Sequence, residues 1–301
     1  MGYEITCNSG GANTRLPKCK GDYGRVLFHI LVPPDFEIAD QSTAETQSTW
    51  QDLIEDTLSD RGYPLPKYFM YSPSREDHLY EQGHYGDKIS IKEGDPDGIA
   101  MYENLPICFA KKLRQFNGQE WKAYAVTEEG FILGKSSDGT KFEPMSVFFF
   151  CEPDKPATSE ESRKTPIRIY ETDSREWMDY GVVIQPTALS SSAWNPADLE
   201  GLLDVNVTIV SSSSTEVVCD VKSTCDLTPV TSLVLADFLL KDDADGSETI
   251  NSVTESTSVD GRYTLDVSTL GADGYVLNLK PPASMTTEGY AGGDDATFTV
   301  T

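Results

Sequence analysis

Residues 203–222 read LDVNVTIVSSSSTEVVCDVK, and this stretch decides the fold that we expect for the last third of the chain. Apolar and polar residues alternate on either side of its central serines. A period of two is typical of β-strands that bury one face and expose the other. The stretch therefore predicts two short strands, over residues 205–211 and 215–222.

The same alternation continues to the end of the chain and predicts five more strands. They are expected over residues 234–240, 249–255, 261–267, 274–280 and 295–301. Short strands that recur at intervals of about 8–12 residues are typical of an immunoglobulin-like β-sandwich. We therefore expect such a sandwich over residues 203–301. Because residues 205–301 hold 15 acidic and 4 basic residues, one of its faces should be strongly negative.

Residues 25–202 predict a β-rich assembly domain that precedes the sandwich. Its first strand is the apolar run RVLFHILV (25–32), which Pro33 and Pro34 close. A continuous apolar run that ends at prolines indicates a buried strand. Further strands are expected over residues 88–92, 121–126, 131–134, 145–151, 166–171 and 181–185. The chain as a whole is thus expected to be mostly β, with a domain boundary near 198–205.

One helix is expected in the assembly domain, over residues 42–61. Trp50, Leu53 and Ile54 lie at helical spacing, which predicts an apolar stripe that packs on the sheet. Gly62 follows as the residue that ends the helix.

Two segments of the first two hundred residues are candidates for contacts between subunits. Residues 1–24 are rich in Gly, Asn, Thr and Lys, and we expect an extended arm that orders against neighbouring subunits, with a frayed terminus as the alternative. Residues 63–84 hold three prolines and four tyrosines and are expected to form an extended aromatic loop, which either contacts a partner or packs on its own domain. The candidate contact residues are Leu16, Pro17, Cys19, Tyr63, Tyr68, Phe69, Tyr71 and Tyr80.

The charge and hydrophobicity of the chain exclude several classes of function. Its 301 residues carry 49 acidic and 24 basic side chains, so the net charge is −25. Nucleic-acid binding by phosphate neutralisation needs clustered Lys and Arg, and the sequence has no such cluster. The acidity serves either solubility or a surface that repels DNA or anionic membranes. No apolar run approaches the roughly 20 residues of a membrane span, and Met1–Glu4 begins no secretory signal, so no membrane insertion is expected.

No motif in the sequence indicates catalysis, a cofactor or a metal. The three histidines are His29, expected to be a packed core residue, and His78 and His84, which match no metal-site spacing. The acidic run 242–246 fails the EF-hand register and indicates a turn. Six cysteines show no C-x2-C pair; the pairs Cys7/Cys19 and Cys219/Cys225 could form disulfides, but reduced thiols are expected. We therefore predict that the protein is not an enzyme and needs no cofactor.

The C-terminal third resembles the immunoglobulin-like repeats of bacterial surface proteins and phage virion proteins. The resemblance rests on Thr228–Val230, Ala236–Phe238, Val253–Glu255, Gly261–Leu265 and the closing stretch 294–301. It implies a fold and leaves the function open.

The first two thirds resemble virion structural proteins of tailed phages that infect Bacteroidetes. The resemblance rests on the stretches Gly11–Pro17, Arg61–Pro66, Glu129–Gly134, Ser137–Thr140 and Leu202–Asn206. It implies a subunit of a tail tube or of a head-to-tail ring, made and assembled in the host cytoplasm and located in the virion. Of the two, we favour a tail tube that conducts DNA, with the sandwich displayed on its outside. Its partners would be copies of itself in a ring or tube and other virion proteins, with duplex DNA as passing cargo that is not bound.

Three other functions stay open at this point. The same parts suit a capsid decoration protein or a head–tail connector of different symmetry. A bacterial cell-surface adhesin is less favoured, because the sequence shows neither a signal peptide nor an anchor motif. A carbohydrate-active enzyme with an accessory sandwich is less favoured too, because no catalytic carboxylate pair is recognisable.

Overall fold

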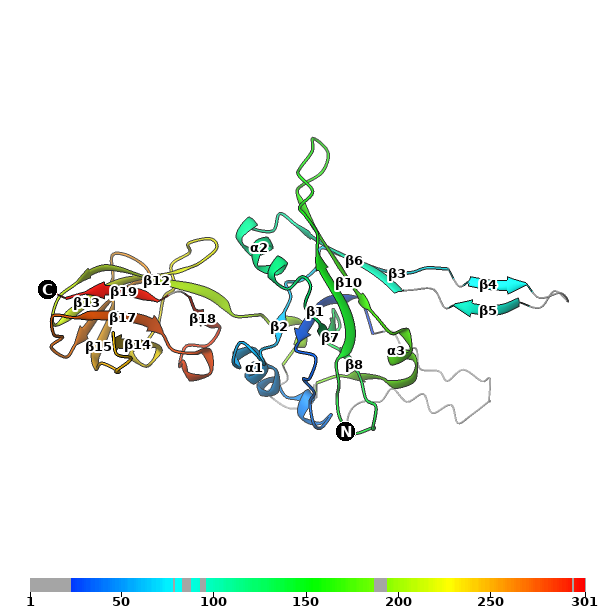
Figure 1. Cartoon of the computed structure of the whole chain (residues 1–301), viewed down its shortest axis with the longest axis horizontal. Helices are drawn as coiled ribbons and strands as arrows, with labels where there is room; N and C mark the ends of the chain where they lie inside the picture. Colours follow the sequence, from blue (N-terminus) through cyan, green and yellow to red (C-terminus); the bar gives the residue numbers. More distant parts are fainter. Residues whose placement is uncertain are drawn as a thin grey trace. The chain divides into compact units, whose positions relative to one another are not determined.

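The computed structural model describes residues 23–77, 79–82, 88–92, 96–186, 194–293 and 295–300. They form two compact units (Figure 1). The first unit contains the described residues up to Glu200 except 55–57, and the second contains 201–300 together with 55–57. Strands account for 43% of the chain and helices for 14%, which confirms the prediction of a mostly β protein.

The first unit is built on a nine-stranded sheet. Its main path runs β11-β8-β7-β9-β10-β6-β3, and β1 pairs with both β7 and β2. Every pairing in this sheet is antiparallel. The strands are β1 (Val26–Val32), β2 (Tyr63–Pro64), β3 (Met70–Arg75), β6 (Pro96–Glu103), β7 (Trp121–Thr127), β8 (Ile132–Lys135), β9 (Met145–Cys151), β10 (Lys164–Glu171) and β11 (Gly181–Ile184).

Strand β1 lies at the centre of the core of this unit. Residues 28–32 are buried without interruption, because β1 is paired along its length with β7. The predicted buried strand is therefore confirmed. Trp50 packs edge-on against Tyr124, with ring centroids 5.1 Å apart, and its indole nitrogen donates to the Ala44 carbonyl at 2.9 Å.

Three helices accompany this sheet where the sequence predicts one, so the predicted number is wrong. The expected helix is present as α1 (Gln47–Glu55), with the short 3-10 turn η1 (Thr43–Glu45) before it. The two others are α2 (Ile107–Gln115) and α3 (Ser174–Tyr180). Helix α3 has only seven residues, and its formation depends on the Asp173 side chain, which accepts from the Arg175 backbone nitrogen at 3.0 Å.

The expected aromatic loop over 63–84 is in fact largely strand. It contains β2, β3 and β4 (Leu79–Gln82). Of the three prolines that suggested a loop, Pro73 lies in β3, which is an edge strand of the sheet and therefore tolerates a residue without an N–H. Pro64 lies in the two-residue strand β2, and Pro66 lies outside the strands.

The second unit consists of two sheets that share one core. A five-stranded sheet runs β15-β16-β13-β12-β18, and a three-stranded sheet runs β14-β17-β19. Buried residues from both sheets, among them Val207, Val221, Leu240 and Leu277, belong to a single hydrophobic cluster. The strands are β12 (Leu203–Ser212), β13 (Glu216–Ser223), β14 (Phe238–Asp242), β15 (Ile250–Glu255), β16 (Arg262–Val267), β17 (Gly274–Leu279), β18 (Tyr290–Gly292) and β19 (Ala296–Thr299).

All seven strands that the alternation predicts are present in this unit, and β18 is an eighth. Strand β18 has three residues and pairs parallel with β12, so it is too short to produce an alternating pattern. The two-sheet arrangement fits the expected sandwich. Its immunoglobulin-like character stays a prediction.

The cysteines differ from the expectation of reduced thiols. Cys108 and Cys225 are each disulfide-bonded, so the expectation is wrong for these two residues. Cys151 and Cys219 are free and buried, which excludes a Cys219–Cys225 pair. Cys7 and Cys19 lie outside the described residues. Two cysteines can form a disulfide only when they lie close together in the fold. Their spacing in the sequence could therefore not predict which cysteines are disulfide-bonded.

The second unit is expected to fold by itself. A fragment of residues 201–301 contains both sheets and the whole of their shared core, so it should unfold in one cooperative thermal transition. Circular dichroism during heating and an NMR spectrum of the fragment test this. Poorly dispersed amide resonances would contradict it.

Candidate subunit interface

A long hairpin projects from the first unit. Strands β3 and β6 are paired from Met70↔Met101 to Arg75↔Pro96 within the main sheet. Between them in the chain, β4 and β5 (Lys88–Lys92) form a separate two-stranded antiparallel sheet. The base of the hairpin, β3 and β6, therefore belongs to the main sheet, and β4 and β5 form its outer part. Figure 1 shows its tip, β4–β5, continuing outward from the ends of β3 and β6.

The tip of the hairpin carries exposed apolar side chains. All four residues of β4 are exposed, including Leu79 at 57% and Tyr80 at 52% of their full accessible area. A two-stranded sheet is marginally stable in water unless it packs against something else. The side chains of β4 are therefore accessible at the surface.

A second exposed apolar surface lies on the main sheet. Along β9 the residues alternate: Val147, Phe149 and Cys151 are buried, whereas Phe148 is 40% and Phe150 39% exposed. Paired residues of neighbouring strands lie on the same face of a sheet. We define the outer face as the residues that share this face on β9, β10, β6 and β3, namely Phe148, Phe150, Arg168, Tyr170, Ile99, Met101 and Met70.

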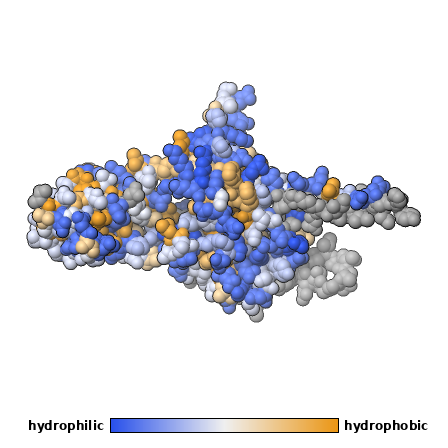
Figure 2. Space-filling model, in the orientation of Figure 1, coloured by the Kyte–Doolittle hydropathy of each residue, from blue (hydrophilic) through white to orange (hydrophobic). Residues whose placement is uncertain are grey.

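The outer face is continuous across four strands. Tyr170 is paired with Phe148, and their rings stack with centroids 5.1 Å apart. Arg168 stands between Phe150 and Ile99, and Met101 is paired with Met70, which is 41% exposed. Figure 2 shows hydrophobic residues gathered over this part of the sheet, where β6 and β10 run.

One arginine pairs with two acidic residues beside the outer face, which leaves one negative charge uncompensated. The Arg168 guanidinium lies 2.6 Å from a Glu152 oxygen and 3.3 Å from an Asp97 oxygen. The hydrogen bond that Arg168 donates to Glu152 and the negative charges of Glu152 and Asp97 raise the pKa of Arg168, so its positive charge is permanent. The chain is strongly acidic overall, and the exposed Phe148, Phe150 and Met70 make this face partly apolar.

The structure sorts the predicted contact residues into two groups. Tyr63, Tyr68 and Tyr71 pack in or against the core of the first unit. Phe69 and Tyr80 are accessible, at 59% and 52% exposure. The remaining candidates, Leu16, Pro17 and Cys19, lie outside the described residues. The role of all eight in subunit contacts stays a prediction.

His29 is a core residue, as the sequence suggested. It is 5% exposed, and its Nδ1 lies 2.9 Å from the Tyr68 hydroxyl. Burial lowers the pKa of His29 to about 3, so the ring is neutral at pH 7. His78 and His84 lie outside the described residues. Within the described ranges, no group of three or more His, Cys, Asp or Glu side chains could hold a metal ion, and no helix is long and apolar enough to cross a membrane.

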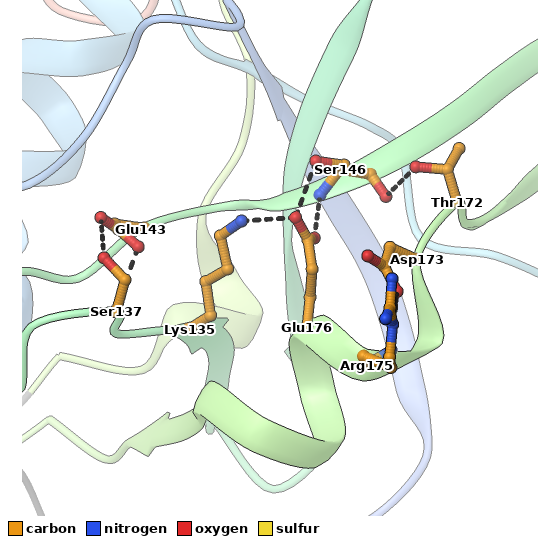
Figure 3. Close-up of polar contacts among 8 residues, drawn as sticks. All are labelled: Lys135, Ser137, Glu143, Ser146, Thr172, Asp173, Arg175 and Glu176. Atoms are coloured by element: carbon orange, nitrogen blue, oxygen red, sulfur yellow. Dashed lines mark hydrogen bonds and ion pairs between the residues drawn. The ribbon is translucent and has the colours of Figure 1, made fainter.

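The polar cluster of Figure 3 lies where α3 meets the sheet. Lys135 of β8 donates to Glu176 of α3 at 2.5 Å. Ser146 of β9 donates to the same carboxylate from its backbone nitrogen at 2.8 Å and from its hydroxyl at 3.0 Å. The side chains of Lys135 and Glu176 are only 16% and 17% exposed. Both carboxylate oxygens are therefore occupied, and the cluster fastens α3 to β8 and β9 rather than offering a free base.

Replacing Glu176 with glutamine should lower the free energy of unfolding of the first unit by about 1–3 kcal/mol, because Lys135 then stays nearly buried without its counter-charge. Glu161→Gln is the matched control, since Glu161 pairs with Lys164 but is 64% exposed. The control should change stability by less than about 0.5 kcal/mol. Urea unfolding of both variants measures the difference, and equal effects would contradict the role given to Glu176.

In comparisons with known proteins, no family model matches the chain, and no curated protein matches its sequence.

Proposed function

We propose that this protein is a non-enzymatic structural subunit that assembles with copies of itself. The assembly that we favour is a phage tail tube made of stacked rings. The observation that carries the proposal is the β4–β5 hairpin tip, which projects from the sheet and exposes Leu79 and Tyr80. A projecting hairpin whose β4 side chains are exposed suits a contact that another subunit completes. The second unit, for which we propose an immunoglobulin-like fold, would be displayed on the outside.

The charge of the chain supports passage of DNA rather than binding. A protein with a net charge of −25 releases no counterions when it meets duplex DNA, so it gains nothing from the phosphates. Repulsion is screened over about 10 Å at 0.1 M salt, so it acts only at the wall of a channel. Such a wall would let DNA slide without adhering.

A cell-surface adhesin is a second candidate that one observation favours. Cys108 and Cys225 are disulfide-bonded, and disulfides persist in oxidising surroundings such as a cell surface. A released virion meets the same surroundings, so the disulfides are compatible with the first proposal as well. A capsid decoration protein or a head–tail connector remains the alternative within the virion.

Electron microscopy of the purified protein tests the proposal. Tubes or stacked rings are expected for a tail-tube subunit, single rings for a connector, and small oligomers for a decoration protein. Monomers at every concentration, or binding to duplex DNA with submicromolar affinity at physiological salt, would contradict the tail-tube function. Specific attachment of the monomer to bacterial cells would favour the adhesin.

A further inference from the structure

We propose that Asp273 is a site of spontaneous covalent modification, where its link to Gly274 rearranges to isoaspartate. The reaction needs no enzyme and no reagent other than water, and it is independent of the function proposed above. The geometry that points to it lies at the start of β17, where one backbone nitrogen is held against one carboxyl group.

The rearrangement begins when the backbone nitrogen of the following residue attacks the side-chain carboxyl carbon of an aspartate. The nitrogen loses its proton, the carboxyl group loses its hydroxyl as water, and a five-membered imide closes. Water then opens the imide at one of its two carbonyls. Opening at the side-chain carbonyl restores aspartate, whereas opening at the main-chain carbonyl leaves isoaspartate, whose backbone runs through the side-chain carbons. Asparagine forms the same imide but releases ammonia instead of water.

The residue that follows the aspartate limits this reaction. Glycine hinders the attack least, because it carries no side chain. Glycine follows aspartate or asparagine at six places in the sequence, namely Asp97–Gly98, Asn117–Gly118, Asp138–Gly139, Asp245–Gly246, Asp260–Gly261 and Asp273–Gly274. All six lie in the described part of the chain, so the fold can distinguish among them.

At Asp273 the two reacting groups lie against each other. The Gly274 nitrogen donates a hydrogen bond to Oδ1 of Asp273 at 2.9 Å. Because the carboxyl carbon is bonded to this oxygen, the nitrogen is held close to the atom that it attacks. Holding two reacting groups in contact raises the rate of their reaction by large factors. Asp273 is also exposed, so water can reach the imide and open it.

In three of the other pairs the side chain is engaged elsewhere. Oδ1 of Asp138 accepts from the backbone nitrogens two and three residues further on, at 2.8 and 2.9 Å. The Asn117 amide donates to the Cys151 carbonyl at 3.0 Å and accepts from the Cys151 nitrogen at 2.8 Å. The Asp97 carboxylate lies 3.3 Å from the Arg168 guanidinium. These contacts hold each side chain away from the following nitrogen.

In the two remaining pairs the glycine nitrogen is engaged elsewhere. The Gly246 nitrogen donates to Oδ1 of Asp242 at 2.6 Å rather than to the aspartate that precedes it. The Gly261 nitrogen donates to Oε1 of Glu255 at 3.3 Å. Of the six pairs, Asp273–Gly274 is therefore the one in which this hydrogen bond joins the two groups that react.

The modification would disturb the end of β17. Isoaspartate adds one carbon to the main chain immediately before Gly274, which is paired with Thr299 of β19. The Asp273 carbonyl also accepts from the Val300 nitrogen at 3.1 Å. We therefore expect the modified chain to lose the pairing of β17 with β19 at this end, and its second unit to unfold at a lower urea concentration than that of the unmodified chain.

Storage of the full chain at mildly acidic pH, followed by digestion and fragmentation mass spectrometry, tests the proposal. Isoaspartate is expected at position 273 at least about tenfold faster than at Asp138, Asp245 and Asp260. Equal or faster formation at any of these three in the folded chain would overturn the proposal.

Two controls separate the effect of the fold from that of the local sequence. In concentrated guanidinium chloride the same four aspartates keep their glycines but lose the fold, so they should react at similar rates. A lead for Asp273 that persists unchanged in the unfolded chain would overturn the role given to the fold. The variant Asp273→Ser has no carboxyl group at this position, so the tryptic peptide that contains it should show no isomer after storage. An isomer of that peptide in the variant, formed as fast as in the wild type, would overturn the assignment to Asp273.

Discussion

Replacing Asp237 with alanine is expected to lower the free energy of unfolding of the second unit by about 3 kcal/mol or more. Asp237 is fully buried, and its carboxylate accepts four hydrogen bonds. The donors are the backbone nitrogens of Val234 at 2.9 Å, Thr286 at 2.6 Å and Thr287 at 3.1 Å, and the Thr287 hydroxyl at 2.7 Å. The carboxylate thus joins the turn before β14 to a loop about fifty residues later. Alanine would leave these donors without a partner.

The pKa of Asp237 shows that the hydrogen bonds prevail over burial. Burial alone would raise the pKa of this carboxyl, but the bonds from Val234, Thr287 and Thr286 lower it below its ordinary value. A carboxyl whose pKa is lowered by folding adds stability above its unfolded pKa, and this stability is lost as the pH falls through the folded pKa.

Urea unfolding of the 201–301 fragment at neutral pH measures the effect of Asp237→Ala. Asp266→Ala is the control, since Asp266 is an exposed carboxylate on β16 of the same unit. The control should change the free energy of unfolding by no more than about 0.5 kcal/mol. Similar losses for both variants would show that Asp237 does not hold the two segments together.

The strands of the second unit were predictable because their signal is local. The residues that recur with a period of two in β12 and β13 are all buried, as expected for strands with one face in a core: Val205, Val207, Val217, Cys219 and Val221. Strand β18 is not predicted from the sequence, because its three residues are too few to show an alternating pattern. Helix α3 was missed for a similar reason, since it depends on one capping side chain and on a carboxylate that binds β8 and β9.

The candidate interface was only partly predictable, because burial depends on what covers each face. The run Phe148-Phe149-Phe150 reads as a strand that is buried on both faces, yet only Phe149 points into the core. The reverse holds for Tyr68, which looked like a loop residue available to partners but packs beside His29. Sequence alone identifies aromatic residues, and the fold decides which of them a partner can reach.

The largest effect of pH on the first unit is expected at His29. Its pKa is about 3 in the folded protein because of burial, against about 6.5 in the unfolded chain. Between these two values the unfolded chain binds a proton that the folded protein does not. The free energy of unfolding therefore falls as the pH falls from about 6.5 to about 3, by on the order of 1 kcal/mol per pH unit. Above pH 6.5 both states are neutral at this position, and the contribution is constant.

A comparison with His29→Asn isolates this contribution from that of the carboxylates. Asparagine keeps a polar group close to the Tyr68 hydroxyl but does not titrate, and the 49 Asp and Glu residues are common to both proteins. Burial raises the pKa values of the neighbouring Tyr68 and Tyr71, so both stay neutral throughout the acid range. Urea unfolding at pH 4 to 8 should show the wild type more sensitive to acid than the variant, with the two curves parallel above pH 7. Curves that stay parallel down to pH 4 would mean that the folded protein protonates His29 as readily as the unfolded chain does, and this would contradict the prediction.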